Sequence, residues 1–469
     1  MRSNDWLSVG VLILMTLAGA VATAMVARRL HRILSFRVFA IAYYTLVNVA
    51  SGIAHILDAA RTRRGFFDAV VALEPGQLLE TSLIAALGLL TICLGVTRGL
   101  PRASHPTPLG SKPLASADRA LIIPVIAVLF PISLWSLLKI QAYASTLDVT
   151  RVSTVSEGLA RYVFLSSWFA PAVLLAAIWA ANLPSRNESL RTPLVLLVAV
   201  VLIAASVQWL GGRSTAFFLS IPLVLVLAAK LRQVTGLAIA SSAAIGLVFT
   251  FVALQQNDFR QSKSAFGVTG PSDWLDWELG RFSMLGFALQ STDRYGLLGG
   301  ETFVESVLRP LAALSQFVGI RAFQSVGQSA TEVVISELFN SSTAIYVVPG
   351  LSAELFLNFG VVGIALGYFA LGRVCGWVDD RFTDSGSILT QLAWAFTGTF
   401  IVKSIGFGGA VITTFLFTGA PLLVVAGASH LIRRQRLDST ANISEDGRHA
   451  GEDDEPARQP SKRGQLSGQ

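Results

Sequence analysis

Charge and cysteine are both scarce in this sequence. Of its 469 residues only 14% are charged and 53% are hydrophobic, whereas an ordinary soluble domain carries about 25% charged residues. The two cysteines, Cys93 and Cys375, stand far apart in apolar stretches, which excludes a disulfide framework and the close spacing of a zinc site. No zincin, Walker, Rossmann or nucleophile-elbow motif occurs. A soluble enzyme of one of those classes is therefore excluded.

What the sequence has instead is a series of long apolar runs. Each is about 20 residues long, the length that crosses a hydrocarbon core of about 30 Å as a helix. The runs are continuously apolar and do not alternate with polar residues, which favours helices over strands. We therefore expect an all-α, polytopic integral membrane protein with about eleven spanning helices, in a transmembrane domain over residues 1–430. The expected spans lie near 6–27, 36–56, 77–97, 120–138, 161–181, 193–210, 215–229, 235–254, 350–372, 388–406 and 410–430.

The basic residues of the short loops set the expected orientation. Lys and Arg favour one set of alternate loops about two to one, and the richer set is cytoplasmic by the positive-inside rule. The N-terminus is then outside and the C-terminus is cytoplasmic. These loops account for the net charge of +7, which does not indicate nucleic acid as a partner. Residues 431–469 are polar and charged, and we expect them to form a disordered cytoplasmic tail.

The longest interval between expected spans is 255–349, which lies outside in this topology. Loops of more than about 15 residues without structure of their own are uncommon, and this one shows helical patterning. In "ETFVESVLRPLAALSQFVGI" (301–320) apolar residues recur at helical spacing, while Glu305 and Arg309 stand four apart on the other face. We expect an external helical subdomain that lies against the membrane surface.

Arg213 is the basic residue whose position argues most directly for a ligand. In "VQWLGGRSTAFFL" (207–219) a tight external turn joins two expected spans; its two glycines permit the turn, and Ser214 can cap the following helix. A helix N-terminus beside an arginine is suited to an anion, because free backbone N–H groups and a guanidinium both face it. The alternative is that Arg213 reaches to lipid headgroups. Arg260, after the next expected span, is either a second anion ligand or the ion-pair partner of Asp258.

Carboxylates are the candidate general bases. Histidine is the usual base, but none of the five histidines lies in the external loop. Glu354 and Asn358 stand four apart at the outer end of the span 350–372, so they share a face, although a glutamate in a first helical turn is also favoured by the helix dipole alone. Glycines at 360, 363 and 367 permit close helix packing. The other candidate carboxylates are Glu337, Glu332 and Asp258.

Several stretches together resemble the bacterial oligosaccharide repeat-unit polymerases, the Wzy-type O-antigen and capsule polymerases. "GGRSTAFFLSIPLVLVL" (211–227) resembles the family's arginine turn before an apolar helix, and "NDFR" (257–260) resembles its arginine after the next helix. "VPGLSAELFLNFGVVGIALGYFALG" (348–372) resembles the Pro-Gly, Glu, Asn-Phe-Gly entry that follows the large external loop. "VLRPL" (307–311) resembles an arginine–proline element within that loop. The spaced Arg…Gly signature of some members is not found, so the resemblance leaves the subfamily open.

The resemblance implies a polymerase in the bacterial cytoplasmic (inner) membrane. It would transfer a growing glycan from undecaprenyl diphosphate to the non-reducing end of a new lipid-linked repeat, at the outer face. Glu354 or Glu337 would deprotonate or position the acceptor hydroxyl. Neither a metal nor a cofactor is required, and the implied partners are the lipid-linked oligosaccharide, the bilayer, and chain-length regulator and flippase proteins. The arginines that would neutralise the diphosphate are Arg213, Arg260 and Arg309, with Arg281 and Arg321 in reserve.

Other functions stay open at this point. An O-antigen ligase moves glycan to the lipid A core, but that family relies on a histidine in the external loop. A transporter or flippase binds its substrate near the bilayer midplane through broken helices in repeated halves, whereas here the charges gather at the external ends and no repeat is visible. A non-catalytic scaffold for envelope assembly is a further alternative.

Overall fold

The described part of the chain is helical. The computed structural model describes residues 3–30, 34–60, 73–98, 114, 116–146, 160–184, 188–208, 213–231, 280–317, 327–339 and 348–449, and no strand occurs among them. The helices are α1 (Ser3–Leu30), α2 (Phe36–Tyr44), a π-helix η1 (Thr45–Ala50), α3 (Ser51–Ala60), α5 (Pro75–Thr97), α6 (Ser116–Thr146), α7 (Ala160–Ser166), α8 (Phe169–Ala181), α9 (Glu188–Gln208), α10 (Arg213–Leu231), α13 (Phe282–Tyr295), α14 (Glu301–Phe317), α15 (Ala330–Phe339), α16 (Gly350–Asp384), α17 (Ile388–Phe407) and α18 (Ala410–His449).

Eight helical segments of the described chain are long and apolar enough to cross a membrane, which makes this a helical, multi-pass membrane protein. They are Trp6–Leu30, Phe36–Ile56, Pro75–Thr97, Asp118–Tyr143, Arg161–Ala181, Gly350–Asp384, Ile388–Phe407 and Ala410–Gln435. Two further expected spans correspond to the shorter apolar helices Arg191–Ser206 and Phe217–Leu227. The expected span 235–254 lies outside the described residues, so the count of eleven stays a prediction.

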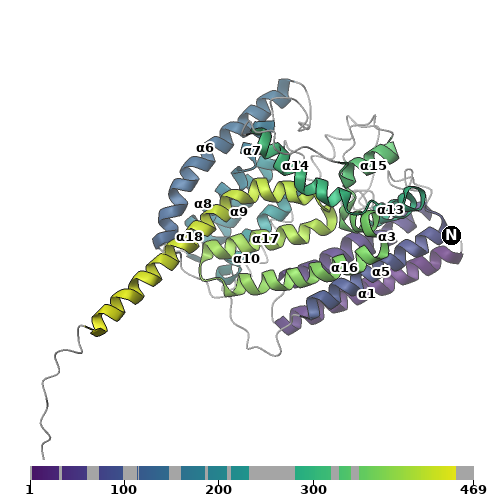
Figure 1. Cartoon of the computed structure of the whole chain (residues 1–469), viewed down its shortest axis with the longest axis horizontal. Coiled ribbons are helices and arrows are strands. Elements are labelled where there is room, and N and C mark those ends of the chain that lie inside the picture. The colour runs from purple at the N-terminus through teal and green to yellow at the C-terminus, as the bar shows by residue number, and fades with distance from the viewer. Residues whose placement is uncertain are drawn as a thin grey trace, which may run out of the picture.

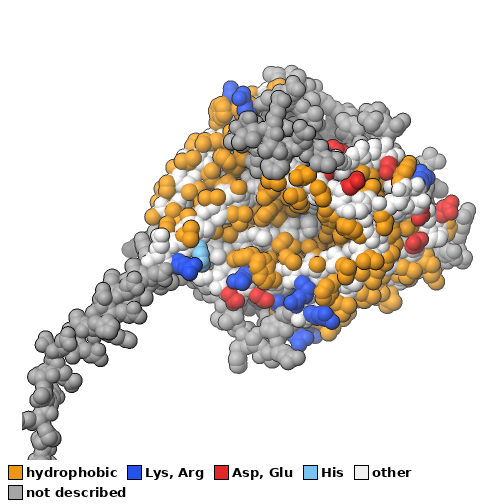
Figure 2. Space-filling view, viewed as in Figure 1, with side chains coloured by type: hydrophobic (Ala, Val, Ile, Leu, Met, Phe, Trp, Pro, Cys, Tyr) orange, Lys and Arg blue, Asp and Glu red, His pale blue; other side chains and the backbone are white. Residues whose placement is uncertain are grey.

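The bundle is organised around α16, which packs between α5 and α17, while α10 and α18 pack on α17. Close approach of α5 and α16 depends on glycine: a Cβ on Gly95 would lie 2.3 Å from the Phe369 carbonyl oxygen, and one on Gly372 would lie 2.6 Å from that of Ile92. Helix α18 runs well beyond the bundle (Figure 1) and continues to His449, into the segment expected to be a disordered tail. Apolar side chains cover the middle of one face of the bundle (Figure 2).

The end of the bundle where α16 finishes holds a tertiary helix cap. Asp379 is buried, and its carboxylate accepts from the Phe36 backbone N–H at 2.9 Å and from the Ser35 hydroxyl at 2.5 Å, at the start of α2. The neighbouring Asp380 pairs with Arg37 at 3.0 Å. The first N–H groups of a helix lack intrahelical partners, so these contacts join α2 firmly to α16.

The expected continuous span 350–372 is wrong, because α16 is broken at Gly360. Gly360 has φ 61° and ψ −148°, which no helix contains. Residues 355 and 367 would be about 18 Å apart in a straight helix, yet a Cβ on Gly367 would lie 2.6 Å from the Leu355 side chain. The Ser352 and Tyr368 hydroxyl oxygens are 2.6 Å apart. Helix α16 is therefore a helical hairpin with a buried first arm, 350–359, and a long second arm, 361–384.

The loop before α14 explains why the first arm can end inside the bundle. The last carbonyls of a helix need partners, and the Leu298 and Gly299 N–H groups donate to the carbonyls of Leu357 and Asn358 at 2.9 and 3.2 Å. The Gly300 N–H donates to the Asn358 side chain at 2.9 Å. This loop therefore holds α13 and α14, which derive from the expected external segment, against the hairpin, and α15 from the same segment is joined to α14 by an ion pair. We call this side of the bundle the loop end.

Candidate functional site

Glu354 lies at the centre of the loop end. It sits on the first arm of α16 with 1% of its surface exposed. Its carboxylate accepts from the Gly409 backbone N–H at 2.5 Å and from the Thr302 and Ser306 hydroxyls at 3.2 and 3.4 Å. These donors come from α14 and from the start of α18, so one carboxylate joins three elements that are remote in sequence.

Asn358 extends the same polar face, as its spacing from Glu354 predicts. Its side-chain N–H₂ donates to the Thr302 hydroxyl and to the Glu354 carbonyl, each at 2.7 Å. Thr302 in turn accepts from Asn358 and donates to Glu354. The polar face of the first arm is thus satisfied by α14 and is closed to water in this conformation.

A glycine turn between α17 and α18 completes this side of the site, and the sequence analysis missed it. Gly408 has φ 56°, and a Cβ there would lie 2.2 Å from the Glu354 carboxylate. A Cβ on Gly409 would lie 2.2 Å from the Ser306 hydroxyl oxygen. Only glycine fits where backbone and carboxylate approach this closely. The sequence feature that could have predicted this turn is "GFGG" (406–409), where three glycines separate two apolar runs.

Arg281 holds the other side of this turn. It is buried, precedes α13, and donates from Nε to the Gly406 carbonyl at 2.6 Å. Its backbone N–H donates to the Val47 carbonyl in the π-helix η1 at 3.1 Å, and its guanidinium lies 5.7 Å from the centre of the Phe407 ring. Arg281 and Glu354 therefore bind groups three positions apart in one turn. The structure gives a central place to an arginine that the sequence predicted only as a reserve ligand.

Lys403 is a second buried cation near Phe407, and the sequence analysis did not single it out. Its Nζ lies 5.0, 5.3 and 5.8 Å from the ring centres of Phe407, Phe400 and Phe218, a geometry that attracts a cation to the aromatic faces. Phe218 belongs to α10, the helix that begins at Arg213. The start of α10 therefore packs beside the end of α17, close to the glycine turn.

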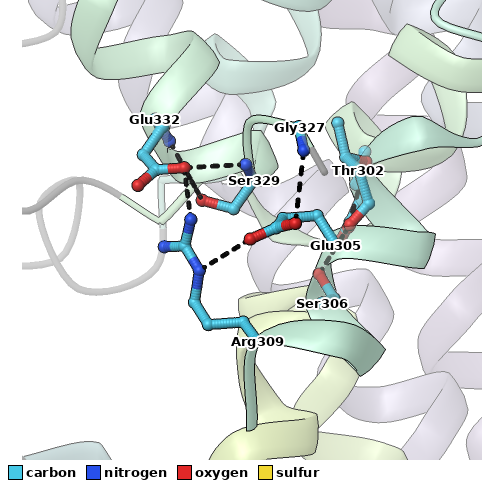
Figure 3. A network of polar contacts seen from close by, with 8 residues as sticks. Thr302, Glu305, Ser306, Arg309, Gly327, Ser329 and Glu332 are labelled. Carbon is cyan, nitrogen blue, oxygen red and sulfur yellow. Dashed lines mark hydrogen bonds and ion pairs between the residues drawn. The ribbon is translucent and has the colours of Figure 1, made fainter. Parts of the chain in front are cut away.

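The polar face of α14 also carries an ion-pair network (Figure 3). Arg309 donates to Glu305 at 3.1 Å within α14 and to Glu332 on α15 at 2.6 Å. Glu332 also accepts from the Ser329 backbone N–H at 2.9 Å, and its own N–H donates to the Ser329 hydroxyl at 3.3 Å, which makes a capping box for α15. The hydrogen bond to Glu332 raises the pKa of Arg309. Burial acts to raise the pKa of the Glu332 carboxyl, but the hydrogen bonds from Arg309 and Ser329 outweigh it and hold that pKa below its usual value.

The remaining predicted residues are less constrained. Glu337 is exposed on α15 and accepts from the Ser291 hydroxyl of α13 at 3.1 Å. Arg213 begins α10, so Ser214 falls within the first turn of that helix; the structure places their backbone only. Arg260 and Arg321 lie outside the described residues. The structure therefore places Glu354 and Arg281 on the same glycine turn, one bound to the Gly409 N–H and the other to the Gly406 carbonyl, and Arg309 lies on α14, whose Thr302 and Ser306 contact Glu354.

Among the described residues, no group of three or more His, Cys, Asp and Glu side chains could hold a metal ion. The chain matches no protein-family model, no curated protein and no solved structure.

Proposed function

We propose that this protein is a membrane glycosyltransferase that polymerises lipid-linked oligosaccharide repeats at the outer face of the bacterial cytoplasmic membrane. It would move the growing glycan from undecaprenyl diphosphate onto the non-reducing end of the next repeat. The observation that carries the proposal is that buried Glu354 and buried Arg281 both bind the backbone of one glycine turn, at Gly409 and Gly406, beside helices of the large expected external loop. The motif resemblance at 211–227 and 348–372 supports the same reaction.

The chemistry of this reaction needs fixed positive charge. A diphosphate leaving group develops charge as the glycosidic bond breaks, and arginine neutralises phosphate through paired N–H donors. In the proposal Arg281 and Arg213 supply that charge beside the glycine turn, with Arg260 and Arg321 as further ligands. Arg309 already pairs with two carboxylates, so a phosphate would first have to displace Glu332.

The two candidate carboxylates take different roles in this proposal. Both oxygens of Glu354 already accept hydrogen bonds, and the side chain is 1% exposed. A group held in this way suits the positioning of the glycine turn and α14 better than proton transfer from a sugar. Glu337 is exposed and can approach an acceptor hydroxyl, so it is the better candidate for the base.

The proposal is tested by substituting the arginines in cells that make the polymer. Arg281→Ala and Arg213→Ala should each abolish long-chain polysaccharide and leave single-repeat glycolipid on the outer face. Arg294→Ala is the matched control, since Arg294 is an exposed arginine near the end of α13. Arg281→Lys, with membrane abundance measured for every variant, separates loss of function from loss of folding. Long polymer in both alanine variants at normal abundance would refute the proposed role of these arginines.

A flippase is the second candidate, and one observation favours it. Transporters bind substrates at broken helices, and α16 is broken at Gly360 with its first arm buried. The same variants discriminate between the two functions: a flippase defect leaves lipid-linked repeats at the inner face, whereas a polymerase defect leaves them at the outer face. A ligase defect would leave polymer of normal length unattached to the lipid A core.

A further inference from the structure

Helix α14 has the reverse of the usual surface pattern. Three of its polar residues, Thr302, Glu305 and Ser306, are 0%, 1% and 8% exposed, whereas Val304 and Val307 are 55% and 44% exposed. A helix on the surface of a soluble protein buries its apolar stripe and exposes its polar face. The polar face of α14 is instead occupied by Glu354 and by the Arg309 network, so its apolar face needs another partner.

The exposed face of α14 continues into the lipid-facing surface of a spanning helix. The Phe303 ring stacks on that of Phe359 at 6.1 Å, with 13° between the ring planes. The second arm of α16 begins just after Phe359 and the break at Gly360, and its Val361 and Val362 are 48% and 65% exposed. In a membrane-spanning segment, exposed branched apolar side chains face hydrocarbon.

We propose that α14 lies in the membrane interface at the loop end, with the face formed by Val304 and Val307 in contact with the hydrocarbon of the bilayer. The occupant is membrane lipid because the surface is continuous with the lipid-facing side of α16. An apolar helix face gains most from transfer out of water when its polar face is already satisfied within the protein. This placement does not depend on the proposed catalytic function.

The placement has a consequence for any lipid-linked ligand. Thr302 and Ser306 point from α14 to Glu354, so the Glu354 cluster lies directly behind an interfacial helix, at the depth of the headgroups. A ligand with a long hydrocarbon tail and a polar head would reach this depth without leaving the membrane. Such a ligand would therefore reach the loop end from the side, along α14.

Site-directed spin labelling tests the placement. Val304→Cys and Val307→Cys are made singly in the full chain, labelled, and reconstituted in nanodiscs of phosphatidylethanolamine and phosphatidylglycerol. Accessibility to oxygen, which concentrates in hydrocarbon, is compared with accessibility to a water-soluble nickel chelate. Val362→Cys, on the second arm of α16, is the lipid reference, and exposed Asp293→Cys on α13 is the water reference. The labelled wild-type chain gives the background from Cys93 and Cys375.

We expect both valine positions to match Val362→Cys, with oxygen accessibility exceeding chelate accessibility. A result like that of Asp293→Cys would overturn the proposal, because the face would then be in water. Low accessibility to both reagents would also overturn it, because the face would then be covered by protein.

Discussion

Gly360→Ala should change the stability of the protein in opposite directions, depending on whether α16 is a hairpin or a continuous helix. In the hairpin Gly360 has φ 61° and ψ −148°, a region essentially restricted to glycine, where another residue costs about 1–3 kcal/mol. Steric clash does not add to this cost, because the nearest atom to a Cβ at 360 would be a Leu297 methyl at 3.7 Å. In a continuous helix the same change would stabilise the protein by up to about 1 kcal/mol, because alanine is the better helix former. The sign of the change therefore distinguishes the two structures.

Equilibrium unfolding of the purified protein in mixed dodecylmaltoside and SDS micelles, followed by tryptophan fluorescence, measures this difference. Gly10→Ala is the matched control, since a Cβ on Gly10 in α1 would meet no atom within 4 Å and the change should be neutral or stabilising. Gly363→Ala gives a second test by a different mechanism, because its Cβ would lie 2.5 Å from the Leu355 carbonyl oxygen and would force the two arms apart. A Gly360→Ala protein as stable as Gly10→Ala would refute the hairpin.

Three further predictions follow from individual contacts. Glu354→Ala should lower the free energy of unfolding by about 1–3 kcal/mol, because the Gly409 N–H is left buried without an acceptor. Glu354→Gln keeps one acceptor oxygen and should recover part of that loss in the same unfolding assay. The lowered pKa of Glu332 means that its contribution is complete above the ordinary carboxyl pKa and is lost as pH falls through the lowered value. Hydrogen-exchange protection at 327–333, measured relative to the intrinsic exchange rate at each pH, should therefore fall below the ordinary carboxyl range in the wild type and should not change over that range in Glu332→Gln. Asp379→Ala should lower the unfolding midpoint by removing the cap of α2, while Asp384→Ala, at an exposed position of the same helix, should not.

The spans were predictable because hydropathy is a local property. A helix that crosses hydrocarbon must be apolar along its whole length and satisfy its own backbone, so segments such as 77–97 and 388–406 are visible without any neighbour. The shared polar face of Glu354 and Asn358 was predictable for the same reason, since it depends only on helical spacing. The apolar stripe of 301–320 likewise indicated an amphipathic helix.

The contacts of the candidate site were not predictable, because they join distant segments. Arg309 was expected to be an anion ligand, but Glu332, 23 positions away, pairs with it across two helices. Arg281 is held in the site by a hydrogen bond to the Gly406 carbonyl, which lies 125 positions away in the sequence. Periodicity carries no information about such pairs. The glycine at position 360 is visible in the sequence, but glycines in membrane helices more often permit close packing. The glycine alone therefore did not predict the break.

The sequence by itself determined that this chain is a multi-pass helical membrane protein, because transfer of apolar runs into hydrocarbon depends on composition and length alone. It also determined that Glu354 and Asn358 share one face of their helix and that 301–320 has separate apolar and polar faces. Only the tertiary structure decided that 350–384 folds into a hairpin, since the carbonyls freed at the break are satisfied by N–H groups of the loop before α14. It also decided that the polar face of α14 turns inward onto Glu354, because a buried carboxylate must find its donors wherever the fold brings them.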